Sequence, residues 1–220
     1  MKRRDITTSS YHHAKLDKAP LLLGSVCRRW RAIALSTPRL WTTFGLTLRP
    51  KYLKYDVLLA KTWLGRSGTC PLFIMLNSKG HYQNTMRPLM QVFLRYCERW
   101  SDIHLCIPQS VMRALSSAKN RLPRLQRLFI YGSANEPINT FENTPQLHHL
   151  HLSVCITPSM IKIPWNQLQY FDTKWRNIGS CLKLLQLTPN LEECTVSHAE
   201  MNLPSPHAPV QHQEIGATTT

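Results

Sequence analysis

The chain has 220 residues, of which 43% are hydrophobic, and its 27 lysines and arginines against 12 acidic residues give a net charge of +15. No apolar run approaches the roughly 18–20 residues of a membrane span, so the sequence predicts no membrane helix. The seven cysteines include no C-x-x-C pair, which argues against a disulfide framework and against a paired-cysteine zinc site. We therefore expect mostly buried, reduced thiols in a cytoplasmic or nuclear protein that needs no cofactor.

The positive charge is concentrated in the first part of the chain. Residues 1–69 hold 14 lysines and arginines against 3 acidic residues, and residues 70–132 hold 9 against 2. Residues 133–220 hold 4 against 7. A basic front half favours a nucleic-acid or acidic protein partner, although it is equally compatible with a surface that only keeps the protein in solution.

The N-terminal region predicts a disordered segment followed by a helix. Residues 1–19 are basic and lack the apolar stretch of a secretory signal. Residues 20–35 have apolar side chains at intervals of three and four, which predicts one helix with a single apolar face. Pro38 forces the preceding residue into an extended conformation, so we expect Thr37 to end this helix and to cap a short second one. That second helix presents Leu40 and Trp41, which we expect to seal these helices onto the following domain.

The middle of the chain predicts alternating strands and helices. The segments "CPLFIML" (70–76) and "WSDIHLCIP" (100–108) have the composition of strands. Residues 83–100 and 108–122 have helical spacing, with Ser110 as the expected N-cap of the second helix. The first of these helices has an apolar stripe formed by Leu89, Val92, Phe93, Tyr96 and Trp100.

Four segments repeat at intervals of 22, 21 and 23 residues, measured between Leu125, Leu147, Leu168 and Leu191. Each follows the pattern L-x-x-Φ-x-Φ, where Φ is an apolar or nearly apolar residue. The first leucine enters a turn, and the next two apolar positions alternate along a short strand. The spacing is typical of leucine-rich repeats, which stack into a solenoid. An ordinary α/β domain with coincidental spacing is the alternative.

The C-terminal end predicts one more helix, over 179–190, and then a disordered tail. Residues 199–220 contain three prolines and few apolar residues. The last strand has no obvious cap, so we expect the chain to be a truncated relative of a longer protein.

The stretch "APLLLGSVCRRWRAIALSTPRLWTTF" resembles the second half of an F-box, in which V-C-x-x-W-x-x-I-A-x-x-x-P-x-L-W recurs. Together with the repeats, which lack the usual asparagine, it resembles the F-box-like proteins with degenerate leucine-rich repeats that are abundant in mushroom-forming fungi. The expected fold is α/β: a short helical partial F-box (20–46) followed by an irregular leucine-rich-repeat solenoid (47–198) of parallel strands alternating with helices. The first F-box helix has no match in residues 1–19.

The resemblance implies a non-enzymatic substrate receptor of a Skp–cullin–F-box ubiquitin ligase in the ubiquitin-conjugation pathway. It implies adaptor-binding residues on the N-terminal helices: Leu22, Leu23, Val26, Cys27, Trp30 and Ile33. A buried helix face is the alternative role for Val26, Trp30 and Ile33. Because the first F-box helix is missing, we expect weak or no binding to the Skp adaptor.

The partner of the repeats is an unknown protein target. Residues that point outward between the apolar strand positions are the expected contacts: Arg127, Phe129, His149, His151, Tyr170 and Asp172. His149 and His151 alternate on a strand, but no third metal ligand accompanies them. A nucleic-acid-binding module is the second hypothesis, because aromatic residues lie between the basic residues of the segment 1–69. No nucleophile–base pair or phosphate loop points to an enzyme, and we expect no membrane partner.

Overall fold

The structure is a computed structural model that describes residues 19–48, 50–78, 86–132, 134–153, 155–175 and 184–198. The segments 1–18 and 199–220, for which disorder is expected, lie outside the described residues. Within the described part of the chain, no helix combines the length and the apolar character needed to cross a membrane.

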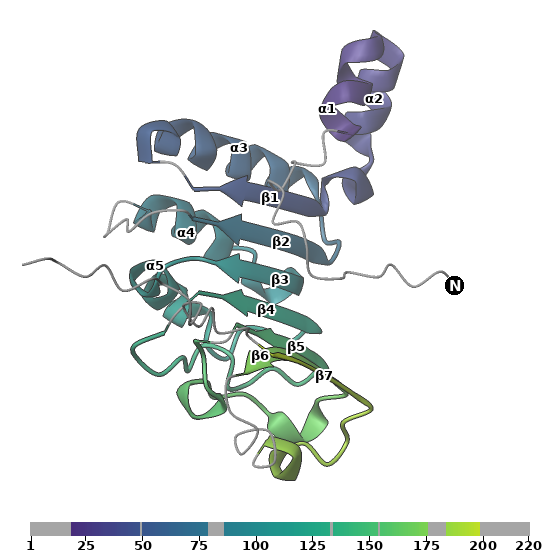
Figure 1. The fold of residues 1–220 in the computed structure, drawn as a ribbon. Coiled ribbons are helices and arrows are strands. Elements are labelled where there is room, and N and C mark those ends of the chain that lie inside the picture. The colour runs from purple at the N-terminus through teal and green to yellow at the C-terminus, as the bar shows by residue number, and fades with distance from the viewer. Residues whose placement is uncertain are drawn as a thin grey trace, which may run out of the picture.

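Seven strands form one open sheet, and they follow one another in the sheet in the same order as in the chain (Figure 1). Every neighbouring pair is parallel, so each connection must return along the sheet before the next strand begins. The strands are β1 (Thr43–Thr47), β2 (Leu72–Asn77), β3 (Trp100–Cys106), β4 (Arg127–Tyr131), β5 (His149–Leu152), β6 (Tyr170–Trp175) and β7 (Glu193–His198). The predicted α/β fold, with parallel strands alternating with helices, is confirmed.

Helices make most of the return connections in the first half of the sheet. α3, α4 and α5 stack in a column along one side of the sheet (Figure 1). The α-helices are α1 (Ala19–Val26), α2 (Arg28–Ser36), α3 (Leu53–Arg66), α4 (Arg87–Leu94) and α5 (Gln109–Ala114). Short 3₁₀ turns complete the connections: η1 (Pro38–Trp41), η2 (Pro50–Tyr52), η3 (Cys97–Arg99), η4 (Leu115–Ala118), η5 (Pro158–Met160) and η6 (Trp165–Gln167).

The core lies between the helices and one face of the sheet. Successive side chains of a strand point to opposite faces, so the strand register aligns every second residue into rows. One such row is at most 2% exposed and consists of Ile74, Ile103, Leu128, Leu150 and Phe171. Leu125, Leu147 and Leu168, which lead three of the repeats, are fully buried beside it. The opposite face, called the open face below, carries polar and aromatic side chains.

The helix predicted over residues 20–35 is broken in two. Cys27 has an extended backbone (φ −158°, ψ 172°), so α1 ends before it and α2 begins after it. The two short helices pack against each other. Thr37 ends α2 as predicted, but its hydroxyl donates a hydrogen bond to the Ile33 carbonyl (2.7 Å) and does not cap η1.

Two helix boundaries and one domain boundary also differ from the predictions. The stripe residues Leu89, Val92 and Phe93 are buried in α4, which ends at Leu94. Trp100 is therefore not part of this helix and is the first residue of β3. At the start of α5 the N-cap position is Pro108, not Ser110. β1 lies across the predicted boundary at residue 46, within a region where the sequence predicts only helices. Of the helix predicted over 179–190, residues 184–187 are helical and 179–183 lie outside the described residues.

Candidate protein-docking surfaces

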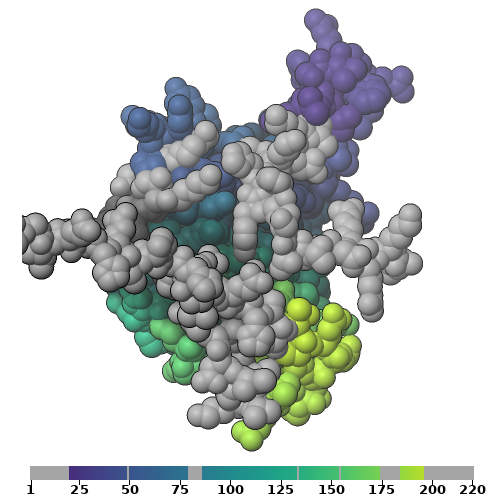
Figure 2. Space-filling model, viewed as in Figure 1, coloured from purple at the N-terminus to yellow at the C-terminus, as the bar shows by residue number. Residues whose placement is uncertain are grey.

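The α1–α2 pair projects beyond β1 at one end of the sheet (Figure 1), and in the space-filling view it stands out from the body (Figure 2). Its helices are held together locally. The Arg31 Nε–H of α2 donates to the Gly24 carbonyl of α1 at 2.7 Å. The Ser25 hydroxyl donates to the Leu22 carbonyl within α1 at 2.7 Å. With the packing of α1 on α2, these bonds make the pair a compact two-helix unit at the edge of the fold.

This unit exposes large apolar side chains. Six of them are between 44% and 62% exposed: Leu21, Leu22, Val26, Trp30, Ile33 and Leu35. Single exposed apolar residues are ordinary on protein surfaces, but a group of this size on two short helices is typical of an interaction site. Of the predicted adaptor-binding residues, Leu22, Val26, Cys27, Trp30 and Ile33 are exposed and Leu23 is half-buried.

Trp41 joins the two-helix unit to the sheet. Its side chain is 1% exposed, and its indole N–H donates to the Ala34 carbonyl at 2.8 Å. On its other side it packs edge-on against Trp63 of α3, with ring centroids 4.9 Å apart. Leu40 is half-buried and packs against the core. These contacts agree with the role of a seal that the sequence predicts for Leu40 and Trp41.

The open face of the sheet carries a continuous series of aromatic and imidazole rings. The register places His104, Phe129 and His151 in one row, and Arg127, His149 and Tyr170 in the next. His104 stacks on Phe129 with centroids 3.9 Å apart. Further ring contacts of 4.7 to 5.9 Å join the following pairs: Phe73–His104, Phe129–His149, Phe129–His151, Tyr131–His151 and His149–Tyr170.

Ion pairs join several aspartate, arginine and histidine side chains of this face. The buried carboxylate of Asp102 lies 2.5 Å from the Arg127 guanidinium and 3.1 Å from His104 Nε2. His151 Nδ1 lies 2.9 Å from the Asp172 carboxylate. Burial lowers the pKa of His149, and the positive charge of Arg127 in the same row lowers it further. The charged groups of this face are therefore paired with one another and lie between the rings.

The predicted target-binding residues are brought together on this face, but they differ in exposure. Arg127 is exposed, and His149, Tyr170 and Asp172 are half-buried. Phe129 and His151 lie on the open face, as expected, but each is only 8% exposed. Neighbouring strands place other rings directly against them, which covers both side chains.

Asp102 and His104 belong to the same cluster and are missing from the predicted site. Both lie in the segment "WSDIHLCIP", where they alternate with the apolar residues Ile103 and Leu105. The alternation places them on the open face. The signal is therefore present in the predicted strand that lies directly before the repeats.

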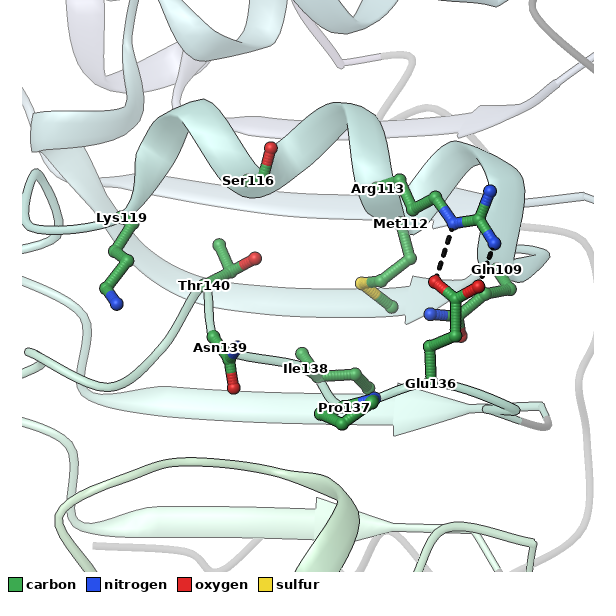
Figure 3. Close-up of a pocket in the computed structure, with 10 residues that line it drawn as sticks. All are labelled: Gln109, Met112, Arg113, Ser116, Lys119, Glu136, Pro137, Ile138, Asn139 and Thr140. Atoms are coloured by element: carbon green, nitrogen blue, oxygen red, sulfur yellow. Dashed lines mark hydrogen bonds and ion pairs between the residues drawn. The ribbon is translucent and has the colours of Figure 1, made fainter.

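A shallow hollow opens on the helical side, between α5 and residues 136–140 (Figure 3). The Arg113 guanidinium and the Glu136 carboxylate form a two-point ion pair across one end of it. Met112 and Ile138 lie between its polar side chains (Figure 3). The two opposite charges at this end of the hollow neutralise each other.

The structure also bears on metal binding and on the stacking of nucleobases. Within the described ranges, no three histidine, cysteine, aspartate or glutamate side chains are placed to hold a metal ion. Of the aromatic residues interleaved with the basic residues of 1–69, Trp41 and Trp63 are buried in the core and cannot stack on nucleobases without unfolding. Trp30, Tyr52 and Tyr55 are exposed.

Comparison with known proteins does not assign the chain to a family. No protein-family profile matches it, and no curated protein is significantly similar to it.

Proposed function

We propose that the chain is a non-enzymatic protein-binding adaptor of the kind that serves as substrate receptor in a Skp–cullin–F-box ubiquitin ligase. The α1–α2 unit docks on a Skp-type adaptor, and the open face of the sheet receives the target protein.

The exposure pattern of the F-box-like motif carries this proposal. Val26, Trp30 and Ile33 of the motif point to solvent, although they are the residues that an isolated domain would bury first. Ala34 and Trp41 of the same motif are buried and attach the helices to the sheet. One short motif thus divides into an anchoring half and a free apolar half, as expected of a docking element.

We further propose that the sheet belongs to the irregular leucine-rich-repeat class. The buried leading leucines and the in-order parallel strands support this assignment. Repeat proteins of this class bind through the face of the strands that is not covered by the return segments. The ring series around Phe129 and His149 lies on that face, which is why we place the target there.

Co-purification with a Skp-type adaptor tests the proposed docking. The informative variant is Val26→Asp, because it places a charge in the exposed apolar group. Leu58→Asp on α3 is the matched control, since Leu58 is 64% exposed and Val26 is 62% exposed. Because the first F-box helix has no match, we expect the wild-type chain and Leu58→Asp to retain the adaptor weakly. Retention should be the same at low and at about 0.5 M salt, because burial of apolar surface is insensitive to screening. Val26→Asp should lose it.

Failure of the wild-type chain to retain the adaptor would contradict the docking role and favour a relative of F-box proteins that does not bind the adaptor. Binding of single-stranded nucleic acid with a steep salt dependence would instead support the basic nucleic-acid-binding module.

A further inference from the structure

A groove runs along the base of the α1–α2 unit, where it meets Trp41 and the end of α3. Of the residues that line it, Pro20, Ala34 and Trp41 are buried, whereas the apolar side chains of Leu21 (50% exposed) and Leu35 (44% exposed) are called its rims below. The eight residues that line it are Pro20, Leu21, Gly24, Arg31, Ala34, Leu35, Trp41 and Arg66. None of them lies on the open face of the sheet, and Val26 and Trp30 are not among them.

The charge of this groove is entirely positive. Arg31 contributes one guanidinium, whose Nε–H is bonded to the Gly24 carbonyl. Arg66 contributes the other, which lies over the Trp41 ring at 4.6 Å from its centroid. Among the described residues, no carboxylate forms an ion pair with either of them.

The surrounding sequence adds to the same sign of charge. Residues 18–55 contain eight lysines and arginines and no acidic residue. Asp17 directly precedes this stretch and Asp56 directly follows it, and Asp56 is 2% exposed. Every ionisable group that the two helices contribute to the groove is therefore cationic.

Both guanidiniums are held in position by the fold. A hydrogen bond to backbone fixes Arg31, and stacking on an indole fixes Arg66 while leaving its N–H groups free to donate in the plane of the guanidinium. Such fixed guanidiniums favour carboxylates, because less side-chain entropy is lost for each hydrogen bond formed.

We propose that this groove binds an acidic amphipathic segment of a partner protein, with a leucine-sized side chain between Leu21 and Leu35 and a carboxylate between Arg31 and Arg66. The charge complementarity commits the site to an acidic occupant, and the apolar rims favour a peptide over a free anion. The inference rests on the proposed docking role of α1–α2, but it concerns a different surface of that unit.

A matched pair of synthetic peptides tests the groove. Both are labelled helix-forming peptides of about 12 residues with leucines along one face, the minimum length for marginal helicity. One carries glutamates beside the leucines, and the other carries glutamines. Fluorescence anisotropy against the full chain measures the affinity of each peptide at low salt and at about 0.5 M salt.

We expect the glutamate peptide to bind about tenfold more tightly than the glutamine peptide, and we expect salt to weaken its binding. Arg31→Gln and Arg66→Gln should each weaken it about five- to tenfold. Arg28→Gln is the control, because it removes the same charge from an exposed site on α2 outside the groove. It should change the affinity less than twofold. Thermal unfolding of each variant shows that the fold is retained.

Three results would contradict the proposal that the groove binds an acidic segment: no binding of the glutamate peptide, equal binding of both peptides, or an Arg28→Gln effect as large as that of Arg31→Gln. Trp30→Ala separates this proposal from the adaptor proposal. It should abolish adaptor retention and leave peptide binding unchanged, because Trp30 does not line the groove.

Discussion

His149 lies in one row of the open face between Arg127 and Tyr170. Burial and the charge of Arg127 lower its pKa below the ordinary value of 6.5. The unfolded chain therefore binds more protons at this residue than the folded chain once the pH falls below about 6.5, and protonation favours unfolding. Asp102 and Asp172 oppose this effect without cancelling it.

We predict that the free energy of unfolding decreases as the pH falls through about 6.5 and that His149→Gln reduces this decrease. Urea unfolding between about pH 7.5 and pH 5 measures it. An unchanged pH dependence in His149→Gln would show that other groups titrate in this range.

The cysteines differ widely in exposure, contrary to the expectation that most are buried. Among the six described, Cys27, Cys155 and Cys194 are exposed, whereas Cys97 is fully buried. Burial raises the pKa of the Cys97 thiol and so keeps it protonated, although the nearby Arg121 charge partly opposes the shift.

We predict that a thiol reagent modifies Cys27, Cys155 and Cys194 rapidly in the folded protein and modifies Cys97 only after unfolding. Peptide mass spectrometry after timed labelling identifies each site. Labelling of Cys97 at the rate of Cys155 would mean that the core around α4 and η3 opens readily.

At the scale of elements, the attachment of α1–α2 depends on Trp41. Replacing Trp41 with alanine empties a site between Ala34 and Trp63 and leaves the Ala34 carbonyl without its donor. We predict a loss of about 3–5 kcal/mol in the free energy of unfolding. Denaturant titration gives the value.

Trp30→Ala is the control for the loss of unfolding free energy in Trp41→Ala, because Trp30 is exposed on the α1–α2 unit. It should change stability by no more than about 0.5–1 kcal/mol. Equal costs for the two tryptophans would contradict the division of the motif into an anchoring half and a free half.

Thr173 of β6 occupies a core row in which Ile130 and Leu152 precede it. It is fully buried, and its hydroxyl has no hydrogen-bond partner within the described structure. Valine has nearly the same shape without the polar atom, so Thr173→Val removes an uncompensated desolvation cost. We predict a gain of about 1 kcal/mol in unfolding free energy. A loss of stability would indicate that the hydroxyl is solvated or bonded in solution. Thr43→Val, in a half-buried site on β1, is the control.

At the scale of the whole molecule, the repeat pattern predicts the sheet because its information is local. Leu125, Leu128 and Ile130 lie within six residues of one another, and their alternation is sufficient to define a strand. The break at Cys27 is harder to predict, since Gly24 and Ser25 lie before it within α1 but no proline accompanies them. It follows from the packing of α1 on α2.

The site is less predictable than the sheet because its contacts join residues about 22 positions apart. The alternation places Phe129 and His151 on the open face, but it cannot show that stacking between strands covers them. Asp102 is identified as a partner of Arg127 only when the register of β3 and β4 is known. Exposure on a sheet face is therefore a property of several strands together.

Hydrogen–deuterium exchange of the chain with and without a Skp-type adaptor tests the central claim most directly, since it locates the docking surface within the whole molecule. We predict that the adaptor slows exchange in residues 19–36 and leaves β2 to β5 unchanged. Protection confined to the strands, with none in α1 and α2, would contradict the assignment of these helices as the docking element.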